Sequence, residues 1–434
     1  MRVESISQAL VRPARKLRGS LSLPGDKSIS HRYAMLAAIA EGRSHLENYS
    51  PGADCASTLH CLRSLGVQWE FQNGSGSVLE IHGNGPKLTP PTQPLNCGNS
   101  GSTIRMLSGI VAAQNFNTEM VGDESLSRRP MERVITPLTS MGAHFTSQNG
   151  YPPLRITGGK LTGIHYRMPV ASAQVKTCLL FAGLLAEYET RIEEPVRTRD
   201  HGEIALRTFG AYVERRGNEV RILGGQRLRG IDARIPGDLS SAAFFLCAAA
   251  LFPDSQLTIT NLLMNPTRAR LLDILMQMGL RISVTQLEEI HGELVGTLQV
   301  QGARLKGATI AGIDTAALID EIPVLAAIAP YTELGVEVRD AKELRVKESD
   351  RIAAVAANLR AMGAQVEELA DGLRIPGSQS LHGAELDSFG DHRIAMAFSV
   401  AALRARGETL IRGSQSAAIS YPGFFSVLES LAER

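Results

Sequence analysis

The 434-residue sequence lacks several signals that would assign it to a common functional class. It has no CxxC pair, and its five cysteines are an odd number, which argues against both a disulfide framework and a zinc site. It has no run of about 18 apolar residues and no apolar core near its N-terminus, so we expect neither a membrane span nor a secretory signal. A reducing cytoplasm is the expected location.

A charge excess and nucleotide-binding motifs are missing as well. The 45 basic residues nearly balance the 44 acidic ones at a formal net charge of +1, which indicates neither a nucleic-acid nor a membrane partner. No GxxxxGK[ST] motif and no strand-linked GxGxxG motif occurs, and this argues against ATP or NAD as a ligand. The length suits two domains of roughly 200 residues each, so any anion site must be local to part of the chain.

An internal repeat is the most informative pattern. Its core, Leu-x-x-apolar-Gly-apolar, is the expected end of an amphipathic helix that has a glycine after its last turn. Five copies and a degenerate sixth lie at 62–67, 138–143, 206–211, 275–280, 359–364 and 428–433. Because the copies are roughly 70 to 85 residues apart, each is expected to belong to a small α/β unit with its own strands.

A second type of helix alternates with the first. Six segments are apolar nearly all round: 33–42, 104–114, 177–187, 242–253, 323–331 and 394–407. Such helices are normally buried on every side, so the helices of the glycine repeat should cover them from outside. Short alternating segments such as 144–148 and 257–262 predict strands. Three units per domain is the natural division, with a boundary near Pro236.

The first turns of the apolar helices differ from their bodies. Ser, Asn and Asp in these turns are ordinary N-caps. Four cations have no such explanation: Lys27, Arg32, Arg105 and Arg393. A cation in a first turn opposes the helix dipole unless an anion binds there, and free N–H groups together with Lys or Arg make a phosphate or carboxylate site. The sequence therefore predicts anion binding at a set of helix N-termini.

Nine segments, in order and at comparable spacing, resemble the EPSP synthase family. They are LPGDKSISHRYAMLAA, NCGNSGSTIRML, GDESLSRRPM, SAQVKTCLLFAGLL, TRDH, PGDLSSAAFF, LIDEIPVLA, LRVKESDRI and FGDHRIAM. The resemblance implies an α/β fold, a two-domain inside-out α/β barrel of six βαβαββ repeats, three per domain. The expected domains are 21–236 and 1–20 plus 237–434, with the active site in the cleft between them.

The family transfers the enolpyruvyl group of phosphoenolpyruvate (PEP) to the 5-hydroxyl of shikimate 3-phosphate and releases phosphate, a step toward chorismate and the aromatic amino acids. The resemblance implies no metal and no organic cofactor. The implied catalytic residues are Lys27, Asp320 as the proton acceptor, and Glu348 as an acid/base partner. The herbicide glyphosate, an anion, is expected to bind in place of PEP.

The resemblance also assigns ligands to each substrate. Those implied for shikimate 3-phosphate are Lys27, Ser28, Arg32, Ser172, Ala173, Gln174, Arg199, Asp320 and Lys347. Those implied for PEP are Lys27, Asn99, Gly101, Arg129, Gln174, Glu348, Arg351, His392 and Arg393. Planar guanidinium groups suit carboxylate and phosphate better than an ammonium does, and a glycine lets the backbone approach a ligand closely.

Two other functions are compatible with the repeat. UDP-N-acetylglucosamine enolpyruvyl transferase shares the fold and the PEP chemistry but carries a cysteine in a mobile loop, whereas the corresponding segment 122–133 has none. A non-catalytic repeat protein that binds anions could dispense with Asp320 and Glu348, and both are present. Since every copy of the outer helix carries polar residues, we expect a monomer.

Overall fold

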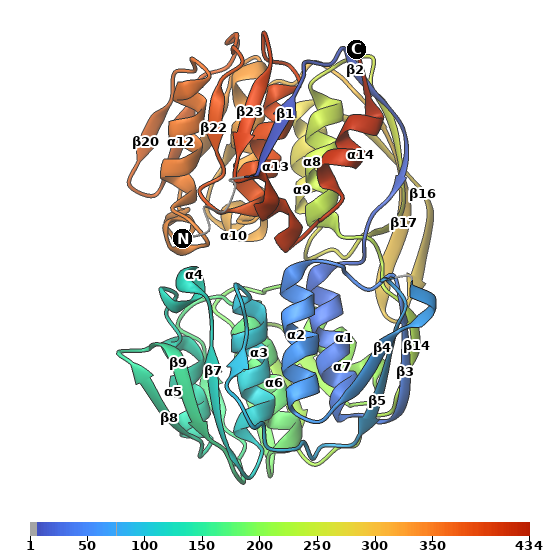
Figure 1. Cartoon of the computed structure of the whole chain (residues 1–434), viewed down its shortest axis with the longest axis vertical. Coiled ribbons are helices and arrows are strands. Elements are labelled where there is room, and N and C mark those ends of the chain that lie inside the picture. Colours follow the sequence, from blue (N-terminus) through green and yellow to red (C-terminus); the bar gives the residue numbers. More distant parts are fainter. Residues whose placement is uncertain (1–6, 75) are drawn as a thin grey trace. The chain divides into compact units, whose positions relative to one another are not determined.

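The computed structural model describes residues 7–74 and 76–434, which divide into two compact units. We call Gly25–Ile235 with His291–Glu293 the N-terminal unit. The C-terminal unit comprises residues 7–24, Pro236–Ile290 and Leu294–Arg434. In Figure 1 the colours follow the sequence, so the dark blue strands β1 (Gln8–Val11) and β2 (Lys16–Ser22) are seen to belong with the yellow-to-red part of the chain.

The N-terminal unit contains three four-stranded sheets and their helices. The helices are α1 (Lys27–Ile39), α2 (Ala53–Ser64), η1 (Gln72–Gly74), α3 (Gly101–Ala112), α4 (Glu124–Ser127), α5 (Glu132–Ser140), α6 (Ala173–Leu185) and α7 (His201–Thr208). The strands are β3 (Glu41–Glu47), β4 (Gln68–Phe71), β5 (Leu79–Asn84), β6 (Leu95–Asn96), β7 (Asn117–Val121), β8 (His144–Gln148), β9 (Tyr151–Thr157), β10 (His165–Arg167), β11 (Glu189–Glu193), β12 (Val213–Arg216), β13 (Glu219–Leu223) and β14 (Asp232–Arg234). Their orders are β14-β3-β5-β4, β6-β7-β9-β8 and β10-β11-β13-β12.

The C-terminal unit also contains three sheets. Its helices are α8 (Leu239–Ala250), α9 (Arg270–Met278), α10 (Ile313–Leu318), α11 (Ile322–Ile328), η2 (Ala329–Tyr331), η3 (Lys342–Val346), α12 (Arg351–Ala361), α13 (His392–Ala402), η4 (Ser414–Ile419) and α14 (Phe424–Leu431). Besides β1 and β2, its strands are β15 (Gln256–Leu263), β16 (Arg281–Ile290), β17 (Glu293–Gln301), β18 (Ala308–Ile310), β19 (Val336–Val338), β20 (Glu367–Leu369), β21 (Gly372–Ile375), β22 (Glu385–Asp387), β23 (Thr409–Arg412) and β24 (Ala432–Glu433). The orders are β16-β17-β15-β2-β24, β18-β19-β21-β20 and β1-β23-β22.

All six sheets share one pairing pattern, in which a parallel pair adjoins an antiparallel pair. The parallel pairs are β14/β3, β6/β7, β10/β11, β2/β15, β18/β19 and β22/β23. In four of these pairs the first strand comes shortly before the buried helix that leads to its partner strand. β14 and β2 instead come from parts of the chain that are distant from their partners. The predicted α/β class is confirmed, and the sequence repeat corresponds to a repeat of mixed sheets.

The two types of helix occupy the two predicted positions. The apolar helices α1, α3, α6, α8, α11 and α13 are buried along nearly their whole lengths. Figure 1 shows α3 and α6 together, with β7, β8 and β9 on one side of the helices of the N-terminal unit and β3, β4 and β5 on the other. Among the described residues, no helix is both long enough and apolar enough to span a bilayer.

The glycine repeat marks the ends of the outer helices, as predicted. Five glycines follow α2, α5, α7, α9 and α12, and their φ angles lie between +86° and +114°: Gly66, Gly142, Gly210, Gly279 and Gly363. Glycine adopts positive φ without the steric penalty that a Cβ brings. The degenerate sixth copy differs because α14 is followed by Ala432 at φ −82°, where no glycine is needed.

Replacing one of these glycines should therefore destabilise the protein through its backbone alone. At Gly210, with φ +95°, an added Cβ would meet no atom within 4 Å. We expect Gly210→Ala to lower the free energy of unfolding by about 1–2 kcal/mol, the cost of a left-handed conformation for an L-residue. Urea denaturation measures the change. Gly159→Ala is the control, since that Cβ also meets nothing within 4 Å but the backbone has no positive φ; equal midpoints for the two variants would contradict the explanation.

Candidate active site

The start of α1 places the first predicted cation. Asp26 caps the helix by accepting a hydrogen bond from the Ile29 amide at 2.9 Å, which fixes Lys27 as the first helical residue. The Lys27 ammonium lies 3.0 Å from Oδ2 of Asp54, on α2. Asp54 was not predicted as a site residue. Its carboxylate pairs with the ammonium and holds it in place.

Arg32 joins α1 to α6. Its side chain is 3% exposed, and Nε and Nη2 donate to Oγ1 of Thr177 at 3.1 and 2.9 Å. Nη1 donates to the Ser28 carbonyl and Nη2 more weakly to that of Ala173. The prediction of a first-turn cation was wrong here, because Arg32 is the sixth helical residue and reaches back to the first turn. Arg105, the fifth residue of α3, does the same.

A second set of contacts joins α3 to α6 and to the segment after α4. Arg105 donates to Oε1 of Gln174 at 2.9 Å, and Gln174 donates to the Ser102 hydroxyl. Arg129 is buried and donates to Oδ1 of Asn99 at 2.8 Å. The helix start at Gly101 lies beside both arginines, since a Cβ there would be 2.8 Å from Arg105 Nη1 and 3.3 Å from Arg129 Nη1. Glycine therefore leaves room for the two guanidinium groups.

The remaining predicted residues of the N-terminal unit lie at helix starts. Ser172 caps α6 by accepting from the Val175 amide at 3.4 Å. Arg199 is half-buried in the segment that leads into α7. We define the N-terminal cluster as Lys27, Ser28, Arg32, Asn99, Gly101, Arg105, Arg129, Ser172, Ala173 and Gln174. These residues come from the starts of three buried helices and from the turn after α4, and cations outnumber carboxylates among them.

Arg351 is the centre of the charged residues in the C-terminal unit. Its side chain is 1% exposed at the start of α12, and Asp350 caps that helix. Nε donates to Asp391 Oδ2 at 2.8 Å and Nη2 to Glu348 Oε2 at 2.6 Å. Nη1 has no hydrogen-bond partner among the described residues and lies 3.6 Å from Asp320 Oδ1. A buried guanidinium with one such edge is suited to binding an anion.

Asp320 lies beside a second guanidinium. Arg393, the second residue of α13, donates from Nη1 to the Asp320 carbonyl at 2.8 Å, and its Nη2 is 3.8 Å from Asp320 Oδ2. Glu321 is buried and accepts from the Ser240 hydroxyl at the start of α8. The starts of α8, α11, α12 and α13 are thereby linked, and we define the C-terminal cluster as Asp320, Glu321, Lys347, Glu348, Arg351, Asp391, His392 and Arg393.

Two predicted residues complete this cluster. Lys347 follows η3, and desolvation lowers its pKa, while the nearby Asp320 carboxylate opposes that change. His392 is the first residue of α13, is 2% exposed, and has Nδ1 3.8 Å from Asp391 Oδ1. Asp391 itself was predicted only as part of a helix start. Its carboxylate also accepts from the Arg393 amide and the Ser349 hydroxyl, so one N-cap organises both arginines.

A group with metal-ligating side chains lies outside both clusters. His165, Glu193 and Glu219, on β10, β11 and β13, present ligand atoms within 4.8 Å of one another. Each carboxylate already has an arginine partner, because Arg167 donates to Glu193 at 2.6 Å and Arg221 pairs with Glu219. This group is therefore a network of ion pairs on the sheet surface, and we assign no metal to it.

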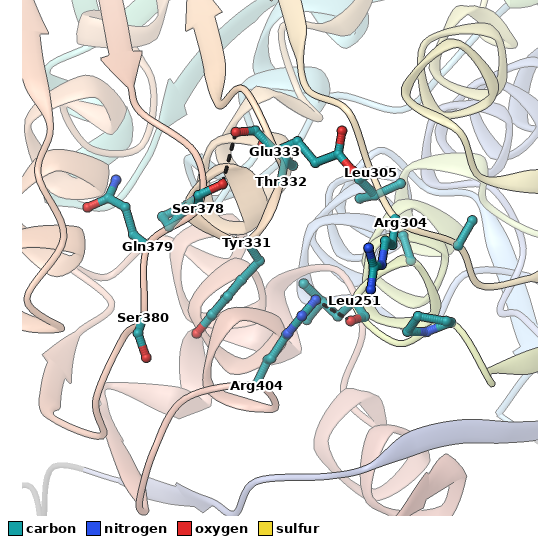
Figure 2. A pocket seen from close by; sticks show the side chains of 14 residues that line it. Leu251, Arg304, Leu305, Tyr331, Thr332, Glu333, Ser378, Gln379, Ser380 and Arg404 are labelled. Atoms are coloured by element: carbon teal, nitrogen blue, oxygen red, sulfur yellow. Dashed lines mark hydrogen bonds between the residues drawn. The ribbon is translucent and has the colours of Figure 1, made fainter.

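The C-terminal unit also has a polar cavity of about 520 Å³ at the far ends of its buried helices. Figure 2 shows Tyr331 and Arg404 among the side chains that line it. Arg404 donates to the Leu251 carbonyl at 2.6 Å, beyond the C-terminus of α8, which suits the negative end of a helix dipole. No predicted site residue lines this cavity. This cavity therefore lies at the C-terminal ends of helices, whereas the two clusters lie at helix starts.

Solved structures with the same fold define the class of protein. The chain superposes on an EPSP synthase from Acinetobacter baumannii with a TM-score of 0.87 and 40% identity, over 99% of this chain and 98% of that one. It also matches the enolpyruvyl transferase NikO from Streptomyces tendae with a TM-score of 0.79 over 98% of each chain, at 20% identity. The fold is therefore that of an enolpyruvyl transferase.

Sequence comparison gives the family. The model of EPSP synthase (3-phosphoshikimate 1-carboxyvinyltransferase) matches residues 11–428. Proteins named 3-phosphoshikimate 1-carboxyvinyltransferase from Koribacter versatilis and Solibacter usitatus are 59% and 55% identical over 424 and 425 residues, which is 98% of this chain and 99% of each relative. The chain belongs to the EPSP synthase family, and the resemblance found in its motifs is confirmed.

His31, beside the N-terminal cluster, should make stability depend on pH. It is fully buried on α1, with Nδ1 2.7 Å from Thr58 Oγ1 and Nε2 without a hydrogen-bond partner among the described residues. Burial lowers the pKa of His31 well below 6.5, the charges of Lys27 and Arg32 lower it further, and Asp26 opposes them. Below pH 6.5 the unfolded chain takes up a proton that the folded chain does not, so stability is lost as the pH falls.

We expect the difference in unfolding free energy between wild type and His31→Asn to shrink as the pH decreases from 7 toward 5. Asn can keep a hydrogen bond to Thr58 but does not titrate, so only the wild type loses the contribution of a neutral imidazole. Urea denaturation at a series of pH values measures the difference. A constant difference across this range would show that His31 is not the group responsible.

Proposed function

We propose that this protein transfers the enolpyruvyl group of PEP to the 5-hydroxyl of shikimate 3-phosphate and releases phosphate, as the names of its relatives imply. The observation that carries the proposal is the buried Arg351, which is held by Asp391 and Glu348 while its Nη1 is directed toward Asp320. An anion clamp and two carboxylates are thus close together, and the reaction needs both.

The chemistry divides into three tasks. The 5-hydroxyl must lose a proton as it attacks C2 of PEP, C3 must gain one, and the tetrahedral intermediate must then lose a proton from C3 as it expels phosphate. We assign Asp320 as the proton acceptor, Glu348 as the acid/base partner at C3, and Lys27 as a cation near the PEP phosphate. Arg129, Arg351 and Arg393 suit the carboxylate and phosphate of PEP, because a guanidinium group can bind either with two parallel hydrogen bonds.

The N-terminal cluster suits shikimate 3-phosphate in this proposal. Ser28, Arg32, Ala173 and Gln174 present donors at the starts of α1 and α6, and Arg199 supplies a further cation. Asp320 and Lys347 would hold its ring hydroxyls. Gln174, Asn99 and Gly101 would contact PEP, together with Glu348 and His392.

The broader organisation is part of the same proposal. We assign the two units as the three-repeat domains of an inside-out α/β barrel, with boundaries near 21–236 for the first and 1–20 plus 237–434 for the second. We also propose that the enzyme is a cytoplasmic monomer. All five cysteines are buried and free, which suits a reducing compartment.

A phosphate-release assay tests the proposed activity. Wild type with PEP and shikimate 3-phosphate should release phosphate and form the enolpyruvyl ether, identified by mass spectrometry. UDP-N-acetylglucosamine as the acceptor should give no product. Turnover with that acceptor in place of shikimate 3-phosphate would overturn the assignment, and so would the absence of turnover with either.

Asp320→Asn should lower turnover by roughly 100-fold or more, the usual contribution of a general base. The amide keeps the size of the side chain but cannot take up the proton of the 5-hydroxyl. Steady-state kinetics at saturating substrates measures the loss. Asp273→Asn, at an exposed carboxylate on α9, is the control and should retain wild-type turnover. Equal turnover in the two variants would contradict the role of Asp320.

Gly101→Ala should weaken inhibition by glyphosate more than it weakens PEP binding. The new methyl group would crowd Arg105 and Arg129, at 2.8 and 3.3 Å, and the longer inhibitor has less room to adjust than the shorter substrate. We expect wild type to be inhibited competitively with PEP and the variant to show a larger rise in the inhibition constant than in KM for PEP. Gly159→Ala should change neither constant. An insensitive wild type, or equal changes in both constants, would refute the prediction.

A further inference from the structure

A buried ionic quartet lies beside the N-terminal cluster, and no part of the proposed reaction uses it. Its members are Lys176 on α6, Glu194 after β11, Glu203 on α7 and Arg215 on β12. Lys176 Nζ lies 3.1 Å from Glu194 Oε2 and 3.0 Å from Glu203 Oε1, and Arg215 Nη2 contacts the same two oxygens. The Lys176, Glu194 and Glu203 side chains are at most 1% exposed. Two cations and two carboxylates balance, as burial requires.

The quartet is attached to the segment that carries Arg199. Glu194 uses Oε2 for the two cations and Oε1 for Thr198, whose amide donates at 3.1 Å and whose hydroxyl donates to the same oxygen. Between them, residues 195–197 are exposed. Thr198 is therefore the half-buried residue that attaches this loop to Glu194, and Arg199 is the next residue.

The other side of the quartet is attached to α6. Lys176 lies two residues after Gln174 and directly before Thr177, the residue that accepts two of the hydrogen bonds from Arg32. One turn of α6 therefore presents Ala173 and Gln174 at the helix start, binds Arg32 through Thr177, and anchors Glu194 through Lys176. Three groups proposed for the phosphate of shikimate 3-phosphate, namely Arg32, the start of α6 and Arg199, are linked to one rigid element.

We propose that Glu194 is a positioning residue that sets Arg199 relative to the start of α6, and so determines affinity for the phosphate of the acceptor substrate. This inference rests on the proposed function. Glu194 acts through Thr198 and does not contact substrate. Lys176 and Arg215 hold the Glu194 carboxylate in one orientation, so Oε1 is fixed where it accepts the hydrogen bonds from Thr198.

The test removes the Thr198 hydroxyl and leaves the buried charges intact. Thr198→Val keeps the β-branched shape and the amide donor, whereas changing Glu194 would leave a buried cation unpaired and threaten folding. We expect KM for shikimate 3-phosphate to rise roughly tenfold, the scale of one lost hydrogen bond to a charged group, with KM for PEP changed by less than about twofold. The control is Thr190→Val on β11, because that hydroxyl is buried and has no hydrogen-bond partner among the described residues.

A double-mutant cycle with Arg199→Met separates positioning from general structure. If Thr198 acts through Arg199, Thr198→Val should have almost no effect on KM for shikimate 3-phosphate once Arg199 is replaced. The inference is overturned if the tenfold effect persists in that background, if Thr198→Val matches Thr190→Val, or if both KM values rise together with a loss of thermal stability. A wild type that releases no phosphate would instead overturn the proposed function, so the two failures are distinguishable.

Discussion

A guanidinium group removed from water must be neutralised by a carboxylate or satisfied by hydrogen bonds, and this requirement shapes the starts of the buried helices in both units. Arg351 can be nearly inaccessible to solvent because the carboxylates of Asp391 and Glu348 neutralise its charge. Arg32 is almost as buried, and a threonine hydroxyl and main-chain carbonyls satisfy it instead. Each arginine is therefore held in position before any substrate arrives, which reduces the ordering that binding must cost.

The same requirement explains why the helices have two kinds of surface. Their bodies pack against sheets and other helices, and an apolar surface all round is the stable solution there. Their first turns carry free N–H groups that need acceptors, and in this chain the acceptors are caps such as Asp26 and Asp391. The Asp391 carboxylate, which caps α13, also accepts hydrogen bonds from Arg351, so one residue both caps its own helix and binds a side chain from another helix.

The sequence predicted best those features that depend on a few neighbouring residues. The glycine after an outer helix follows from local backbone geometry, and five of the six copies have it where it was expected. Ser and Asp were expected as caps of the apolar helices, and Ser100, Ser172 and Asp391 are such caps. Sequence periodicity also separated buried from outer helices. The candidate site residues were predicted from the resemblance of their motifs. The side chains that they contact come from distant segments, and no local sequence pattern specifies those contacts.

The features that escaped prediction are pairings between distant segments. Asp54 lies on a different helix from Lys27, and nothing in its own surroundings in the sequence marks it as a partner. The helix register of Arg32 was misjudged because its guanidinium reaches back over a full turn. Lys176 was the one visible signal of the buried quartet, since a lysine within an otherwise apolar helix must have buried carboxylate partners, but their identity depends on the fold.

Strands β2 and β14 each pair with a strand that is distant in the sequence, and this affects the order in which the sheets can form during synthesis. β14 lies at the end of the N-terminal unit and completes the sheet that begins with β3, so nearly all of that unit can fold while the rest of the chain is still being synthesised. β1 and β2 are synthesised first, but they pair with β23 and β15, which are made after that unit. In the nascent chain β2 therefore has no β15 partner until the N-terminal unit has been made, and β1 has no β23 partner until much later, so the edges of both strands need protection from other chains in the meantime.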